Sequence, residues 1–210
     1  MPVWLLLKIL IAYLLGSLIG SLIVGKIYGG VDIRTQGSGN AGSTNALRTQ
    51  GRVFALWVML IDVGKGVLAA GLLPHLLAAQ NELSPEWTAV ACGAAAIVGH
   101  VFPVFFRFHG GKGFATFLGV LAMLSWPALI AAVIVWCLVL VLSGYVGLST
   151  LLAAWAVPVF AVIVHGYAAP LFWFGLVMAL FIVYTHRGNI RRLAAGKENR
   201  FTRVMLLRRR

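Results

Sequence analysis

The sequence predicts an all-α integral membrane protein with seven transmembrane helices, one of them short. Of its 210 residues, 61% are hydrophobic and 10% are charged, and the mean hydropathy is +0.96. About a quarter of the residues of a soluble domain are charged. Several apolar runs are long enough to cross a bilayer, which takes roughly 20 residues. We therefore expect a single transmembrane domain over residues 1–210, ending in a basic cytoplasmic tail over residues 187–210.

The expected spans follow the apolar runs in chain order. The run over 114–142 is too long for one untilted span, and Ser125-Trp126-Pro127 divides it into a short helix and a longer one. The first span carries Gly16, Ser17, Gly20 and Ser21, small residues that allow close helix approach. The expected spans are 3–25, 54–79, 87–106, the two parts of 114–142, 148–164 and 168–185.

The basic residues indicate the orientation of these spans. With seven spans, the first, third and fifth loops share a side with the C-terminal tail, and that side holds 15 of the 17 lysines and arginines. Basic loops remain in the cytoplasm, so the N-terminus is expected outside and the C-terminus inside. A six-span arrangement would distribute these charges over both sides. Within the second span, Asp62 and Lys65 are three residues apart on one face and should pair with each other or point into the bundle. We expect a structural ion pair, with a direct catalytic role as the alternative.

The first motif is a run of nine small or polar residues, 37–45, between the first two spans. Its glycines allow left-handed backbone and can direct successive N–H groups to one point, and Arg48 follows as a fixed cation. The run contains no carboxylate, so it suits an oxyanion such as a phosphate, although a flexible connector is the simpler alternative. The candidate catalytic residues here are Ser38 and Arg48, and the candidate substrate-binding residues are Gly37, Gly39, Asn40, Thr44 and Asn45.

Two further motifs lie on the same side of the predicted membrane. In residues 99–116, Gly110, Gly111, Lys112 and Gly113 precede a helix, whose N-terminus attracts anions. The third motif, residues 186–193, supplies His186 and Asn189 and is followed by Glu198, although His186 can instead simply cap the seventh helix. The three motifs together can hold two phosphorylated groups.

Several other classes of site are disfavoured. The G-x-G-x-x-G match at 37–42 lacks a βαβ context, and Lys112 is followed by glycine rather than by the Ser or Thr of a P-loop. Histidines and acids show no metal-ligand spacing, so neither metal nor cofactor is expected. No histidine precedes an aspartate by four residues, which excludes the His-x4-Asp device of many glycerolipid acyltransferases. The net charge of +12 indicates membrane lipid headgroups rather than nucleic acid, and Cys92 and Cys137 are expected to be packing residues.

The three motifs closely resemble those of the bacterial acyl-phosphate:glycerol-3-phosphate acyltransferases. The matching segments are 37–45, 99–103 with 109–116, and 186–190 with Gly196 and Glu198, and the resemblance reaches about Phe201. It implies a multi-pass inner-membrane enzyme with a cytoplasmic active site. The implied reaction transfers a fatty acyl group from acyl phosphate to the 1-hydroxyl of glycerol 3-phosphate, which gives lysophosphatidic acid and phosphate. The sequence does not specify an oligomeric state, and a monomer is compatible with it.

The resemblance also implies roles for particular residues. Ser38, Arg48 and Lys112 match phosphate-handling residues, and His186 and Asn189 match the polar pair of the third motif. Glycines 110, 111 and 113 correspond to a glycerol-phosphate loop. His109 stands where the family usually has lysine, which reduces the positive charge there at neutral pH. The fifth loop, 144–150, departs from the serine pattern of some relatives, and Ser149 and Thr150 in it are assigned as substrate-binding residues. Glu198 matches an acid of structural role, and Asp62 and Lys65 are also assigned as structural.

The chemistry of an acyl phosphate sets the expected mechanism. It is a mixed anhydride with a good leaving group, so direct transfer needs no acyl-enzyme. The base is either His186 or the phosphate of the substrate itself.

A membrane transporter of phosphorylated organic anions is the alternative function, because it would use the same cations. However, transporters usually bind near the midplane between repeated halves, and this sequence has no internal repeat. A non-catalytic lipid-binding protein would account for the basic tail but not for the motifs.

Overall fold

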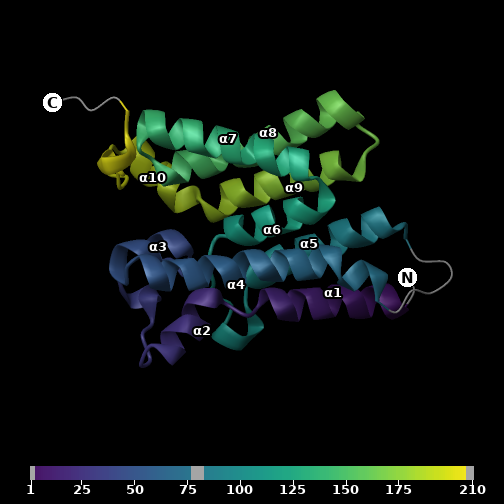
Figure 1. Ribbon diagram of the computed structural model, residues 1–210, viewed down its shortest axis with the longest axis horizontal. Coiled ribbons are helices and arrows are strands. Elements are labelled where there is room, and N and C mark those ends of the chain that lie inside the picture. The colour runs from purple at the N-terminus through teal and green to yellow at the C-terminus, as the bar shows by residue number, and fades with distance from the viewer. Residues whose placement is uncertain (1–2, 77–82, 207–210) are drawn as a thin grey trace. The chain divides into compact units, whose positions relative to one another are not determined.

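The computed structural model describes residues 3–76 and 83–206, and helices are the only regular secondary structure over these residues. The chain forms two compact units, residues 1–124 and 125–210 (Figure 1). In the first unit, apolar clusters include Ala12, Ala69 and Ala96, all fully buried. Such small buried residues allow helices to approach closely, as is typical of helix packing in membranes.

The first unit is built around helices α1, α4, α5 and α6. α1 packs against α5, α4 packs against both α5 and α6, and the short helices α2 and α3 pack on α4. Figure 1 shows α1, α4 and α5 running alongside one another. The helices of this unit are α1 (Val3–Gly16), α2 (Gly20–Ile27), α3 (Ser43–Thr49), α4 (Arg52–Gly71), α5 (Pro85–Val101) and α6 (Phe114–Leu124), with 3-10 helices η1 (Ile33–Thr35), η2 (Leu73–His75) and η3 (Val104–Phe106).

The first span is broken, and the prediction of one continuous helix over 3–25 is wrong. α1 ends at Gly16, α2 begins at Gly20, and the two helices are bent by 47°. Lys65 Nζ of α4 donates to the carbonyl oxygens of Gly16 (2.9 Å) and Leu18 (3.0 Å). Asp62 Oδ1 accepts from the backbone N–H of Gly20 (3.1 Å). A break in a membrane helix persists only where its freed backbone groups find such partners.

Other boundaries also differ from the prediction. α4 ends at Gly71 rather than near residue 79, and η2 follows it with Pro74 at its second position. The predicted loop over 80–86 lies partly outside the described residues, and Ser84 caps α5 by accepting from Trp87 N–H (3.4 Å). The predicted first loop, 26–53, contains the short helices η1 and α3. The sequence did not predict them, because short polar helices leave no long apolar run.

The predicted division of 114–142 is confirmed. α6 has 11 residues and α7 (Trp126–Ser143) has 18. Ser125 Oγ accepts from the N–H of Ala128 (3.4 Å), and Pro127 stands in the first turn of α7, as is common at helix starts. The expected packing of both cysteines is only half right, because Cys92 is buried whereas Cys137 on α7 is exposed.

The second unit consists of consecutive helices that pack on one another: α7 on α8 (Val146–His165), and α8 on α9 (Pro170–Thr185). Gly175 of α9 lies against Pro158 of α8, where a side chain would collide with the proline. The predicted polar tail contains α10 (Arg187–Ala194) and η4 (Thr202–Val204). It then returns to the α7–α8 turn, where Phe201 N–H donates to the Gly144 carbonyl (2.8 Å).

The lengths and compositions of these helices fit a multi-pass membrane protein. Within the described residues, four helical segments are long and apolar enough to span a bilayer, and two bent pairs bring the total to six if each pair is one span. The bent pairs are α1 with α2 (47°) and α9 with α10 (60°), and α6 is a shorter apolar helix. The four segments are Arg52–His75, Pro85–Phe106, Trp126–Ser143 and Val146–His165.

Candidate active site

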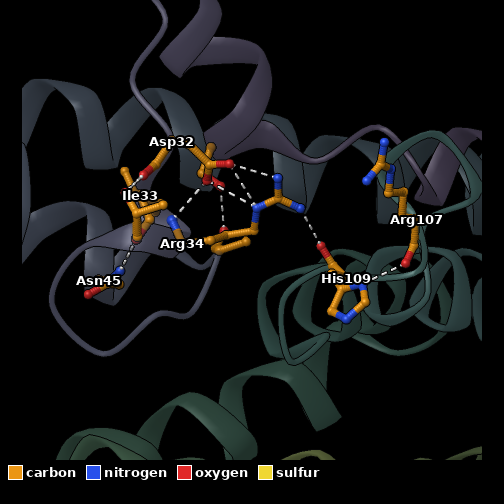
Figure 2. A network of polar contacts seen from close by, with 9 residues as sticks. Asp32, Ile33, Arg34, Asn45, Arg107 and His109 are labelled. Atoms are coloured by element: carbon orange, nitrogen blue, oxygen red, sulfur yellow. Dashed lines mark hydrogen bonds and ion pairs between the residues drawn. The ribbon is translucent and has the colours of Figure 1, made fainter.

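An Asp32–Arg34 pair begins the loop that carries the first motif, which we call the first-motif loop (residues 32–45). Asp32 Oδ1 accepts from Arg34 N–H (2.9 Å), and the guanidinium returns to the same carboxylate with a closest approach of 2.7 Å. The hydrogen bond from the Arg34 side chain holds the pKa of Asp32 below its usual range. The remaining arm of Arg34, Nη1, donates to the carbonyl of His109 (3.0 Å; Figure 2). Arg34 therefore fastens the first-motif loop to the second motif.

The side chain of Asn45 stabilises the conformation of the first-motif loop through hydrogen bonds to its backbone. Its side chain is buried, its Oδ1 accepts from Ser38 N–H (2.9 Å), and its Nδ2 donates to the carbonyls of Ile33 (2.9 Å) and Gln36 (3.0 Å). Figure 2 shows Asn45 turned toward Ile33. The sequence predicted a substrate contact for Asn45, and in the structure its amide is engaged with the loop backbone.

The other predicted residues of the first motif line the outer side of this loop. Gly37 and Gly39 adopt left-handed backbone (φ 57° and 71°), as the motif requires. Ser38 and Arg48 are exposed, and Asn40 and Thr44 are half-buried. The buried Ser21 hydroxyl of α2 donates to the Ala41 carbonyl (2.7 Å) and ties the loop to the helix below it. The polar groups thus remain near the surface while the loop backbone is fixed.

The second motif forms a tight loop over residues 102–113, the second-motif loop. Its glycines fold back onto the end of α5, where Gly111 N–H donates to the His100 carbonyl (3.1 Å) and Gly110 N–H to the Val101 carbonyl (3.2 Å). Gly113 takes a left-handed conformation (φ 88°) immediately before α6 begins. Lys112 is half-buried within this glycine stretch. The structure therefore places Lys112 and the glycine backbone at the start of an 11-residue helix, as predicted.

Arg107 and Phe108 of the second-motif loop are strained. Both are non-glycine residues with left-handed φ, 54° and 60°, a conformation that costs energy and persists where surrounding contacts impose it. The exposed ring of His109 contacts the backbone of these residues, with its Nδ1 2.6 Å from the carbonyl oxygen of Arg107 (Figure 2). The Arg34 contact at the His109 carbonyl helps to hold this conformation.

A shallow pocket of about 240 Å³ lies beside the Arg34–His109 contact that connects the two loops. Lys26, Arg34 and Phe106 are among its lining residues, whereas Ser38, Arg48 and Lys112 are not. The predicted anion-binding residues thus lie outside this pocket, and the candidate site consists of the two loops.

The third motif surrounds the junction of α9 and α10 in the second unit. His186 is buried, and its Nδ1 lies 2.9 Å from the Ile182 carbonyl, which can only accept. The ring proton of neutral His186 is therefore on Nδ1 and the lone pair on Nε2. Asn189 Nδ2 donates to Glu198 Oε1 (2.7 Å), and Glu198 Oε2 accepts from Arg192 Nε (2.8 Å). Glu198 thus orients the Asn189 amide.

Ser149 and Thr150 are the fourth and fifth residues of α8, and both are buried. The Ser149 hydroxyl donates to the Tyr145 carbonyl (2.9 Å), and the Thr150 hydroxyl accepts from the indole N–H of Trp136 (3.3 Å). In the structure these hydroxyls serve contacts within α8 and between α7 and α8. Their role in substrate binding remains a prediction.

Fold and loops define a multi-pass membrane protein whose cation-bearing glycine loops suit anionic ligands. Over residues 3–76 and 83–206, no three His, Cys, Asp or Glu side chains form a group that could hold a metal ion. The family model for glycerol-3-phosphate acyltransferase matches residues 6–196. The chain belongs to this family and is an acyltransferase.

Individual relatives agree with this assignment. The chain is 40% identical over 202 residues to a glycerol-3-phosphate acyltransferase of Synechococcus sp. (strain JA-3-3Ab), covering 95% of this chain and 96% of the relative. It is 44% identical over 201 residues to that of Methylococcus capsulatus, covering 95% and 97%. A crystal structure of PlsY (YgiH), an integral membrane glycerol 3-phosphate acyltransferase in its glycerol 3-phosphate form, has a TM-score of 0.81 at 34% identity, covering 94% and 95%. The form with lysophosphatidic acid has a TM-score of 0.78 at 33% identity, covering 93% and 94%.

Proposed function

We propose that this acyltransferase transfers a fatty acyl group from acyl phosphate to the 1-hydroxyl of sn-glycerol 3-phosphate, releasing lysophosphatidic acid and inorganic phosphate. Family membership over residues 6–196 and similarity to the glycerol 3-phosphate and lysophosphatidic acid forms of PlsY support this reaction. The observation that carries the proposal is the pair of glycine loops fastened together by the Arg34–His109 contact (3.0 Å). One loop leads to Arg48 and the other contains Lys112.

The reaction requires two anionic substrates to be held close together and correctly oriented. Arg48 and Lys112 supply fixed positive charge, and Ser38, Asn40 and Thr44 supply polar groups on or beside the first-motif loop. Glycines 110, 111 and 113 shape the loop that brings the phosphate of glycerol 3-phosphate to the start of α6, where the unpaired N–H groups of the first helical turn favour an anion. The same cations stabilise the negative charge that develops on the carbonyl oxygen during attack.

Acyl transfer is direct, because the phosphate of a mixed anhydride leaves readily and no acyl-enzyme is needed. The substrate's own phosphate is the better candidate for the base. His186 donates through Nδ1 to a neutral carbonyl (2.9 Å), which stabilises an imidazolium less than a carboxylate would. His186 then acts through hydrogen bonding, together with the Asn189 amide that Glu198 orients.

The topology belongs to the same proposal. We infer seven spans in a single transmembrane domain of the bacterial inner membrane, with the N-terminus outside and the active site and basic tail in the cytoplasm. Six candidate spans that include the two bent pairs, plus α6 as a short span, support the count. The basic residues support the orientation. The enzyme works among membrane lipids and requires no cofactor, and a monomer is compatible with this arrangement.

The test uses the purified full-length protein in lipid vesicles with palmitoyl phosphate and glycerol 3-phosphate. We expect phosphate release that requires both substrates and yields lysophosphatidic acid. Lys112→Ala should lower the rate by about a hundredfold or more, since it removes a charge that stabilises the transition state. Lys197→Ala, which removes an exposed lysine from the tail, is the matched control and should leave the rate unchanged.

Two outcomes would contradict the proposal. Absence of phosphate release, combined with passage of labelled glycerol 3-phosphate across the vesicle wall, would favour a transporter. An acylated enzyme formed from palmitoyl phosphate alone would exclude direct transfer.

In the same assay, His186→Ala should keep a measurable fraction of the activity while Arg48→Ala loses nearly all of it. The reverse order would make His186 the base.

A further inference from the structure

A buried cluster of Asp62, Lys65 and His100 lies beneath the two motif loops of the first unit. Lys65 Nζ is 3.0 Å from Asp62 Oδ1 and 2.7 Å from His100 Nδ1, and His100 Nδ1 is 3.4 Å from Asp62 Oδ1. None of these side chains is more than 3% exposed. Buried charges of this kind are costly in a membrane protein and are usually retained for a function.

The cluster fixes the break in the first span. Lys65 donates to carbonyls at the C-terminal end of α1, and the carboxylate of Asp62 accepts from the first N–H of α2 (3.1 Å). A cation thus meets the negative end of one helix dipole, and an anion meets the positive end of the next. Because Ser21 of α2 donates to the Ala41 carbonyl (2.7 Å), the position of α2 also affects the first-motif loop.

His100 connects the same cluster to the second-motif loop. A charged Lys65 has only donors, so His100 Nδ1 accepts and the ring proton is on Nε2. The Nε2 edge lies against Gly111, where an added Cβ would collide with it, and an added Cβ at Gly110 would collide with the His100 carbonyl. The N–H of Gly111 donates to that carbonyl (3.1 Å). The loop therefore rests directly on both the ring and the backbone of His100.

We propose that His100 is a positioning residue. The Asp62–Lys65 pair holds His100 in place, and His100 fixes the position of the Gly110–Gly113 backbone that binds glycerol 3-phosphate. This inference rests on the proposed function, since it assigns that substrate to the loop. His100 is buried under the loop, so it acts through the loop backbone and not through the reacting atoms. Loss of the ring support should thus weaken glycerol 3-phosphate binding more than it affects acyl phosphate.

The experiment compares His100→Leu with His100→Asn in the vesicle assay, because leucine and asparagine have similar shapes but only asparagine can accept from Lys65. We expect His100→Leu to raise the KM for glycerol 3-phosphate by about tenfold or more, while the KM for palmitoyl phosphate stays within about twofold. His100→Asn should stay within about threefold of the wild type for both substrates. His165→Leu, which changes an exposed histidine at the end of α8, should leave both KM values unchanged.

A merely structural role would reduce the yield of folded protein and leave the KM of the folded fraction unchanged, and that result would overturn the proposal. Equal KM values for the leucine and asparagine variants would overturn it as well. If His100→Leu does not fold, Gly111→Ala tests the contact from the other side, and the smaller side chain of His100→Asn should lower the raised KM in the double variant. No recovery there would overturn the proposal. A wild-type enzyme that releases no phosphate with glycerol 3-phosphate would instead refute the function itself.

Discussion

Asn45 shows how one buried amide can determine the shape of the first-motif loop. Asn45→Ala leaves the Ser38 N–H and the Ile33 and Gln36 carbonyls without their side-chain partner. We expect a loss of about 2–4 kcal/mol in the free energy of unfolding, since an unsatisfied buried group costs about 1–3 kcal/mol. Thermal or denaturant unfolding in detergent measures this change, with the exposed Asn199→Ala as control. Unchanged stability combined with a raised KM would make Asn45 a substrate ligand instead.

At the residue scale, the sequence predicted chemical types better than roles. The glycines, hydroxyls and cations of the first motif were identified from their density in an otherwise apolar chain. Arg34 was not predicted as a site residue, because its partner at His109 is 75 residues away and is a backbone carbonyl that no side-chain pattern encodes. The only available signal was the Asp32-x-Arg34 spacing just before the motif.

At the element scale, the packing of α4 on α6 depends on glycine at one position and not at another two residues away. An added methyl at Gly66 would collide with the backbone of Thr116 and Val120, whereas a methyl added at Gly64 would meet no atom within 4 Å beyond its own helix turn. Gly66→Ala should lower stability by about 1–3 kcal/mol through overpacking. Gly64→Ala should be neutral or stabilising by up to about 1 kcal/mol, since alanine favours a helix. Paired thermal unfolding curves measure both changes, and similar losses would contradict this packing.

Helix positions could be predicted from apolar runs, but the break in the first span could not. Residues 17–19 are Ser-Leu-Ile, which contain no proline and read as continuous helix. The break is stabilised from outside, by Lys65 and Asp62 of α4, so its cause lies more than 40 residues further along the chain. By contrast, the boundary between α6 and α7 was predictable, because Ser125 and Pro127 carry the capping signal locally.

At the scale of the whole molecule, hydropathy and charge predicted an all-helical membrane protein, and three polar motifs predicted its family. The family match over residues 6–196 confirms the resemblance. The number of spans is harder to derive, since α6 has only 11 residues, about half the usual length of a span. The orientation of everything after α6 depends on whether this helix crosses the bilayer.

Cysteine labelling decides whether α6 crosses. In a chain with Cys92 and Cys137 replaced by alanine, single cysteines are placed at Thr35, Glu86, Tyr167 and Asn199, all of them exposed positions. If α6 spans, an impermeant maleimide should label Glu86→Cys and Tyr167→Cys in intact spheroplasts, and Thr35→Cys and Asn199→Cys only after permeabilisation. If α6 does not span, Thr35→Cys and Glu86→Cys keep their pattern while Tyr167→Cys and Asn199→Cys exchange theirs. That exchange would also place the basic tail outside, against the charge rule, and would refute the seven-span topology.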